Sequence, residues 1–265
     1  MRCIMNKNLL LYLLLMLRIK RPFLKSAGIA ALLLITLIFA SCQSYPPSFD
    51  INQFYNSYNE KVDFTDNESY IVVTPKNTRS SSPSDTGIIF YPGGLVDYHS
   101  YLPLMTRCAE KGFVCYIVKM PHDFAFMDRR AAGRFVSNHP EIKKWYVAGH
   151  SLGGAMAASY YSKHKNNFEG LILLASYSTR NISDSNTKVL SIYGSNDTVL
   201  NLENYQKYKR NLPSVGDGLT EIVINGGNHS QFANYGLQEG DGKAEISSDE
   251  QQRITAEEIS LWAGI

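Results

Sequence analysis

Short apolar runs recur along the chain from residue 69 onward, each bounded by polar or glycine-containing segments. Several are continuous stretches of Val, Ile, Leu and Tyr, without the polar alternation of a strand that faces solvent on one side. Such runs suit strands that are covered on both faces. The predicted strands are residues 70–74, 88–91, 114–119, 145–148, 171–175, 189–193 and 221–224.

Longer segments with helical patterns lie between these runs. They predict helices over residues 98–111, 124–137, 152–165, 200–211 and 249–262. This alternation of strands and helices predicts an α/β fold, with a doubly wound, mainly parallel sheet and helices on both faces. Residues 76–86, rich in Ser, Thr, Asn and Asp, predict a turn that joins two strands.

The first 42 residues differ in composition from the rest and are expected to be a signal peptide. Apolar runs at 9–17 and 27–40 flank a basic cluster, and both are shorter than the roughly 20 residues of a membrane span. A basic segment before the second run fits a secretory signal. The end of that run, Ile38-Phe39-Ala40-Ser41-Cys42, resembles the lipobox of bacterial lipoproteins, although Phe39 stands where Leu is usual.

The resemblance implies lipidation of Cys42 and an extracytoplasmic protein anchored to a membrane. An uncleaved signal anchor, or ordinary cleavage nearby, is the alternative. Met16 precedes a segment that would itself make a normal signal, so we take Met16 as the hypothetical initiator. Residues 43–66 are polar and aromatic, and they predict a tether to one domain at 67–265.

The net charge of +2 comes from the N-terminal segment. Residues 1–42 hold six basic and no acidic residues, which leaves 20 basic and 24 acidic residues in the rest of the chain. A mildly acidic domain without a basic stripe argues against nucleic acid as a partner. Cys108 and Cys115 lie on a predicted helix and the following strand, where they form either a disulfide or two small buried thiols.

The segment Gly149-His150-Ser151-Leu152-Gly153 follows an apolar strand and precedes a helix rich in small residues. This strand–turn–helix context turns a common G-x-S-x-G match into a predicted nucleophile elbow, a sharp turn that exposes the Ser151 hydroxyl. Glycines are needed at both ends of the motif, because side chains there would collide across the turn. The helix N-terminus also places backbone N–H groups beside the nucleophile.

The elbow resembles that of the α/β-hydrolase family, whose catalytic residues follow in the order Ser, acid, His. Asp197 comes just after the strand 189–193, where the family places its acid, and Asp184 is the reserve candidate. His229 follows the last predicted strand through two glycines, so its loop can bring it to Ser151 and Asp197. The resemblance implies that His229 is the general base and that Asp197 orients it.

The family's oxyanion hole uses backbone N–H groups after an inner strand and after the nucleophile. In this sequence these are the amides of Gly94 (alternatively Gly93 or Leu95) and Leu152. The chain is most similar to small, lidless bacterial serine hydrolases. Its segment spacing also resembles the dienelactone-hydrolase branch, which has Cys where this chain has Ser151. About thirteen residues join the strands 171–175 and 189–193, which leaves no room for a lid.

Residues that follow strand ends are expected to line the substrate pocket. They are Leu95, Tyr98 and His150, with Val96, Tyr177 and Val199 as further wall residues. The segment 238–245 follows the histidine, and its contacts are not predictable. No metal-ligand cluster or dinucleotide motif occurs in the sequence, so no cofactor is expected.

These features predict a serine hydrolase that cleaves a carboxylic ester, thioester or lactone through an acyl-enzyme. Its partners would be a small acyl substrate and, through the lipid, a membrane. Two alternatives stay open at this point: a surface lipoprotein that only binds, because a fold does not guarantee activity, and an acyltransferase that uses the same residues.

Overall fold

One eight-stranded sheet organises the residues that the computed structural model describes, 44–76, 84–184 and 186–265. Its strand order is β1-β2-β4-β3-β5-β6-β7-β8. β1 and β2 pair antiparallel, as do β2 and β4, and the remaining pairs are parallel. The strands are β1 (Val62–Asp66), β2 (Tyr70–Pro75), β3 (Thr86–Tyr91), β4 (Val114–Val118), β5 (Lys144–His150), β6 (Gly170–Leu174), β7 (Val189–Gly194) and β8 (Leu219–Ile224).

Every strand that the apolar runs predict is present, with ends within two residues of the prediction. The continuous runs belong to inner strands: each residue of β3, β4 and β6 is buried. The edge strand β8 is only partly buried along its middle. This is the pattern expected when helices cover both faces of a parallel sheet.

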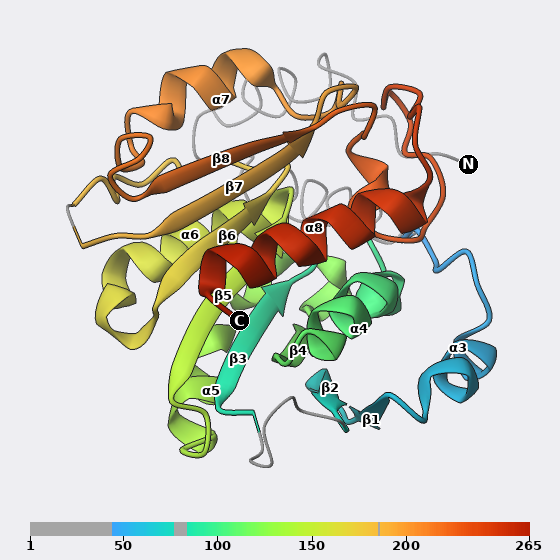
Figure 1. Cartoon of the computed structure of the whole chain (residues 1–265). Coiled ribbons are helices and arrows are strands. Elements are labelled where there is room, and N and C mark those ends of the chain that lie inside the picture. The colour runs from blue at the N-terminus through green and yellow to red at the C-terminus, as the bar shows by residue number, and fades with distance from the viewer. Residues whose placement is uncertain (1–43, 77–83, 185) are drawn as a thin grey trace, which may run out of the picture. The chain divides into compact units, whose positions relative to one another are not determined.

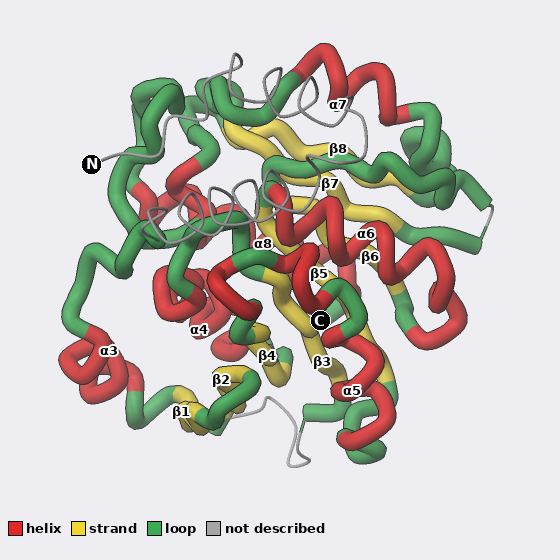
Figure 2. The backbone as a smooth tube through the Cα atoms, turned by 180° about the vertical axis from the view of Figure 1, so that it is seen from behind, coloured by secondary structure: helices red, strands yellow, loops and turns green. Residues whose placement is uncertain are grey.

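Helices cover the two faces of the sheet in separate groups (Figures 1 and 2). Buried residues of α4 and α8 share one hydrophobic core with one face, and those of α5 and α6 share a second core with the other. The α-helices are α3 (Ile51–Tyr58), α4 (Leu102–Glu110), α5 (Ala131–Asn138), α6 (Leu152–His164), α7 (Leu202–Lys209) and α8 (Ser248–Ala263). Short 3-10 helices are η1 (Tyr98–Tyr101), η2 (Pro121–Asp123), η3 (Ala125–Asp128), η4 (Lys165–Asn167) and η5 (Ser230–Phe232).

The doubly wound α/β fold is therefore confirmed. Two predicted helices are each divided, 98–111 into η1 and α4 and 124–137 into η3 and α5. Between β6 and β7, residues 175–184 and 186–188 contain no helix, so this connection carries no helical lid.

Residues 44–66 are not the tether that the sequence predicts. They contain α3 and β1, and Tyr45–Ile265 forms one compact unit. The aromatic residues of the segment are the physical reason, because their rings bury one another: Phe54 and Tyr55 of α3 lie 6.0 Å and 4.7 Å from Phe64 of β1, ring centre to ring centre. The predicted signal peptide, with Met16 and Cys42, lies outside the described residues.

Cys108 and Cys115 are both buried and free, so the alternative of two buried thiols is the correct one. Burial raises the pKa of Cys115 well above its usual value, which keeps it an unreactive thiol. In the described part of the chain, no helix is both long enough and apolar enough to cross a membrane.

Candidate active site

Ser151 occupies the sharp turn between β5 and α6. Its backbone angles, φ 53° and ψ −123°, lie in a region that non-glycine residues rarely adopt. Two hydrogen bonds hold this conformation: the Ser151 N–H donates to the Leu174 carbonyl at 2.9 Å, and the Ser176 hydroxyl donates to the Ser151 carbonyl at 2.7 Å. The predicted elbow is therefore present, and hydrogen bonds to the end of β6 and to the residues just after it hold its strained backbone conformation.

The glycines of the elbow allow backbones to pass within contact distance. A Cβ atom at Gly149 would lie 2.6 Å from the carbonyl carbon of Gly153. A Cβ atom at Gly153 would lie 2.2 Å from the Tyr91 carbonyl oxygen, at the end of β3. Both positions exclude a side chain, and they bring α6 against the segment that follows β3.

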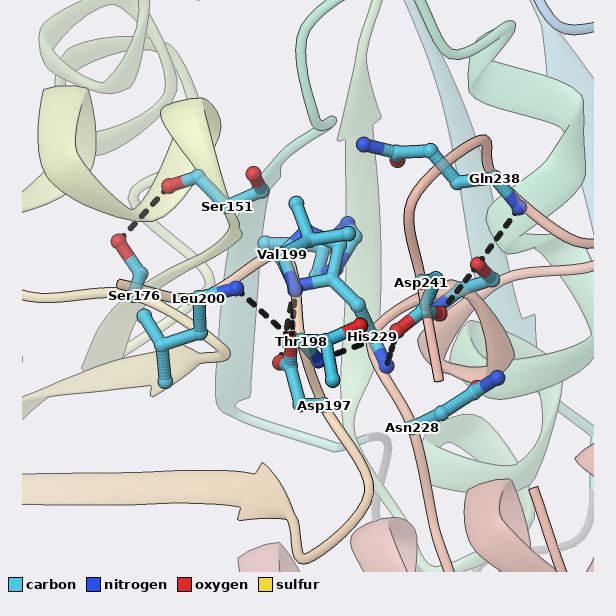
Figure 3. A network of polar contacts seen from close by, with 12 residues as sticks. Ser151, Ser176, Asp197, Thr198, Val199, Leu200, Asn228, His229, Gln238 and Asp241 are labelled. Carbon is cyan, nitrogen blue, oxygen red and sulfur yellow. Dashed lines mark hydrogen bonds and ion pairs between the residues drawn. The ribbon is translucent and has the colours of Figure 1, made fainter. Parts of the chain in front are cut away.

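Asp197 and His229 form a buried pair after β7 and β8. The Nδ1 atom of His229 lies 2.9 Å from the Asp197 carboxylate, and both side chains are almost fully buried. The other Asp197 oxygen accepts the N–H groups of Val199 and Leu200 at 2.9 and 2.8 Å. Figure 3 shows Ser151 on one side of this pair. Asp184, the reserve acid, is exposed and pairs with Lys165 instead.

The remaining ring nitrogen of His229, Nε2, is buried and has no hydrogen-bond partner among the described residues. Because Nδ1 faces Asp197, Nε2 is the position that remains for a hydroxyl or a substrate. Beside the strained turn of Ser151, this unpartnered nitrogen is where a ligand or a reacting group can supply the missing hydrogen bond.

The three amides considered for an oxyanion hole differ in their partners. The Gly93 N–H donates to the Tyr101 hydroxyl at 2.9 Å, and the Leu95 N–H donates to the Asp123 carbonyl at 2.9 Å. A Cβ atom at Gly94 would lie 3.0 Å from the Leu152 side chain, so Gly94 is adjacent to the residue after the nucleophile. Of the three, the Gly94 N–H is the one to which the described chain offers no acceptor.

The sequence matches the model of a known family, the alpha/beta hydrolase family, over residues 87–253. The chain belongs to this family. The match runs from β3 into α8 and includes the elbow, Asp197 and His229. None of the curated proteins compared with this hydrolase matches it.

Solved structures share the fold at low sequence identity. TT1662 from Thermus thermophilus has a TM-score of 0.54 and 13% identity, covering 76% of this hydrolase and 98% of that chain. Thermogutta terrifontis esterase 2 has a TM-score of 0.52 and 15% identity, covering 77% and 94%. Est1E from Butyrivibrio proteoclasticus has a TM-score of 0.52 and 12% identity, covering 77% and 100%.

The predicted pocket residues of the hydrolase lie at different depths. Leu95, Tyr98, Tyr177 and Val199 are partly exposed, whereas Val96 and His150 are 2% and 1% exposed. The two buried residues therefore lie beneath the surface and are not open pocket walls. His150 lies against the candidate base, with its ring centre 4.5 Å from that of His229.

Asp241 and Gln251 hold the histidine loop, and the sequence analysis missed both. The Asp241 carboxylate accepts the N–H and hydroxyl of Ser230 at 2.8 and 2.6 Å and the N–H of His229 at 3.3 Å. Gln251 of α8 forms two hydrogen bonds with the backbone of Asn228, at 2.9 and 2.8 Å. Asp241 lies in the segment 238–245, which packs beside the acid and histidine loops (Figure 3).

Proposed function

We propose that this hydrolase is a serine hydrolase that cleaves a carboxylic ester, thioester or lactone through an acyl-enzyme. Ser151 is the nucleophile, His229 the general base and Asp197 the residue that orients the base. The buried Asp197–His229 hydrogen bond, which leaves His229 Nε2 without a partner, is the observation that carries the proposal. An orienting carboxylate, a base and an exposed hydroxyl are the parts that nucleophilic acyl transfer requires.

In the acylation step, His229 Nε2 takes the proton of the Ser151 hydroxyl while the oxygen attacks the acyl carbon. The carbonyl electron pair moves onto its oxygen and returns as the bond to the leaving group breaks. The leaving oxygen or sulfur then receives the proton from His229. Water then attacks the acyl carbon of the acyl-enzyme as it gives up a proton to His229, and His229 passes that proton to the Ser151 oxygen as the carboxylic acid leaves.

The Gly94 and Leu152 amides are proposed to stabilise the oxyanion that forms in both steps. Gly94 has the free N–H of its turn, and Leu152 is the first residue of α6, where N–H groups have no partner within the helix. Preorganised donors of this kind each contribute roughly 10²–10³-fold to kcat in comparable sites.

A fluorophosphonate probe tests the nucleophile directly. The wild type should be labelled, and Ser151→Ala should lose labelling together with roughly 10⁴-fold or more of its hydrolysis of p-nitrophenyl butyrate. Thermogutta terrifontis esterase 2, a structural neighbour, has been solved phosphorylated by paraoxon, which supports an organophosphorus reagent. An unlabelled wild type that matches Ser151→Ala in hydrolysis would instead favour a protein that only binds.

The identity of the acyl group is open to a direct measurement. Leu95 and Tyr98 are proposed as substrate-contacting residues, because both are partly exposed on the loop that follows β3. A series of p-nitrophenyl esters from acetate to palmitate, assayed with residues 43–265, would define the chain-length preference. Adding an alcohol to these assays separates hydrolysis from acyl transfer, since a transferase would form the new ester.

We also propose that the mature protein is a lipoprotein anchored through Cys42, on the basis of its signal-like N-terminus. Radiolabelled palmitate should be incorporated into the wild type and found in the membrane fraction. Cys42→Ser should lose the label. Retention of the label in Cys42→Ser would contradict the proposal.

A further inference from the structure

Tyr101 connects His150 to the turn after β3 that contains Gly93 and Gly94. Its ring is fully buried, and its hydroxyl oxygen lies 2.9 Å from the Gly93 nitrogen and 2.9 Å from His150 Nδ1. These contacts leave no room for a side chain at Gly93, because a Cβ atom there would lie 2.9 Å from the Tyr101 hydroxyl oxygen and 2.9 Å from His150 Nδ1. One hydroxyl therefore joins η1, the turn after β3 and the end of β5.

The direction of these hydrogen bonds follows from the number of protons available. The Gly93 N–H can only donate, so the Tyr101 oxygen accepts there. Burial raises the pKa of Tyr101 well above its usual value, so the phenol keeps its proton. Among the described residues, His150 Nδ1 is the one acceptor within reach of that proton, so the hydroxyl is assigned as the donor to it. His150 Nδ1 is consequently an acceptor, and a neutral His150 carries its own proton on Nε2.

His150 is neutral because it is buried. Burial, and secondly the neighbouring His229, lower the pKa of His150 well below its usual value. Its Nε2 atom is buried without a hydrogen-bond partner among the described residues, as is Nε2 of His229. The centres of the two imidazole rings lie 4.5 Å apart, so a charge on His229 disfavours one on His150.

We propose that Tyr101 and His150 are positioning residues of the active site: the Tyr101 hydroxyl fixes the turn that presents the Gly94 amide and holds His150 as its Nε2–H tautomer against His229. This inference rests on the proposed function. The Tyr101 hydroxyl accepts the Gly93 N–H and so fixes the orientation of the turn. The next amide, that of Gly94, then has no acceptor in the described chain and can donate to the oxyanion. A neutral His150 lets the proton from Ser151 reside on His229 alone.

Three variants separate this role from simple packing. Tyr101→Phe keeps the ring and removes the hydroxyl. His150→Asn places an amide oxygen near the position of Nδ1, where it can still accept from Tyr101, and His150→Leu has a similar branched shape without an acceptor. We expect Tyr101→Phe and His150→Leu to lower kcat for p-nitrophenyl butyrate by about 10- to 100-fold, with KM within about twofold, and His150→Asn, which keeps an acceptor for Tyr101, to lose less kcat than His150→Leu.

A packing role predicts the opposite order, because an apolar Leu fills a buried site better than Asn. Activity of Tyr101→Phe within about twofold of wild type, or His150→Leu above His150→Asn, would overturn the proposal. Nitrogen-15 NMR of the imidazoles supplies a second measurement that does not depend on any variant folding. In the wild type it should show His150 protonated at Nε2, and protonation at Nδ1 would overturn the proposal equally.

The same experiments distinguish a failure of the proposed function from a failure of the positioning role of Tyr101 and His150. A wild type that neither hydrolyses esters nor reacts with a fluorophosphonate contradicts the proposed function. The NMR tautomer of His150 then still decides whether Tyr101 donates to it. An active wild type with unaffected Tyr101→Phe contradicts only the positioning role.

Discussion

Asp197 does two things with its two carboxylate oxygens: one faces His229 Nδ1, and the other accepts the N–H groups of Val199 and Leu200. Asp197→Asn keeps an oxygen for the backbone and replaces the one that orients the base. We expect kcat to fall by roughly 10⁴-fold with the fold intact, because an amide favours the wrong tautomer of His229.

Asp184→Asn is the matched control, since Asp184 is an exposed acid in the preceding loop. Steady-state kinetics of both variants on p-nitrophenyl butyrate, with circular dichroism to verify folding, make the comparison. A large loss at Asp184 and a small one at Asp197 would reassign the acid.

His150 should also make the stability of the protein depend on pH. Its pKa is well below 6.5 in the folded protein, mainly through burial, so below pH 6.5 the unfolded chain binds a proton that the folded chain does not. The free energy of unfolding should therefore fall as the pH decreases from 6.5 toward the folded pKa, by up to about 1.4 kcal/mol per pH unit.

Urea unfolding of the wild type and His150→Asn between pH 7.5 and 5 measures this contribution. The difference between the two curves isolates His150, because the other titrating groups are common to both proteins. Parallel curves would show that His150 does not titrate in this way.

At the residue scale, the structure forms the predicted turn at Ser151 and the predicted Asp197–His229 contact, while the catalytic roles of these residues stay predictions. Ser151, Asp197 and His229 each follow a strand whose apolar pattern is clear, and the sheet brings those ends together. Tyr101 and Gln251 could not be found in this way. Each reaches the site from a helix, and a Tyr or Gln at such a position looks like any other helical residue until packing directs it inward.

At the scale of whole elements, α8 matters to the site although no residue of it belongs to the proposed triad. Gln251 accepts the Asn228 N–H and donates to the Asn228 carbonyl, so the helix fixes the residue before His229. Gln251→Leu leaves both backbone groups buried without a partner, at a cost of about 1–3 kcal/mol each. We expect a lower thermal midpoint and a kcat reduced by roughly 10-fold, since the base shifts with its loop.

Arg253→Gln serves as the control on the same helix. Its side chain is exposed and pairs with Glu250 and Glu257, and exposed ion pairs contribute about 0–1 kcal/mol. Differential scanning calorimetry and kinetics on both variants test the assignment. Equal losses at the two positions would mean that general helix stability, and not the contact with Asn228, is responsible.

The sequence located the strands whose burial is complete, β3, β4 and β6, with ends within two residues of the structure. The missed strand, β1, is the edge strand of the sheet, and the missed α-helix, α3, directly precedes it in the chain. β1 has one fully buried residue, Val62, so its pattern carries little of the signal that identifies an inner strand. The aromatic residues of this segment pack against one another in the structure. In the sequence they stand in a polar stretch with two prolines near its start, which is typical of a tether.

At the scale of the whole molecule, the folded domain begins only a few residues after the proposed lipidation site, because Tyr45 is already part of it. The Tyr45 N–H donates to the Leu95 carbonyl at 2.7 Å, and its carbonyl accepts the Asp97 N–H at 3.0 Å. The chain is thus held on the loop that supplies the Gly94 amide. A lipid on Cys42 would be separated from Tyr45 by two residues, Gln43 and Ser44, which is at most about 11 Å of chain.

We therefore expect the proposed lipid to hold the active site close to the membrane surface and to favour acyl esters embedded in the bilayer. A flexible 20-residue Gly/Ser spacer inserted between Ser44 and Tyr45 would have a root-mean-square length of about 25 Å and would release that constraint. Hydrolysis of a fluorogenic phospholipid ester in vesicles carrying the lipidated protein should fall by about 5-fold or more, while hydrolysis of p-nitrophenyl butyrate stays the same. An equal loss on both esters would show that the spacer damaged the oxyanion loop, and no loss on either would show that the proximity of Tyr45 to the lipid has no role in substrate access.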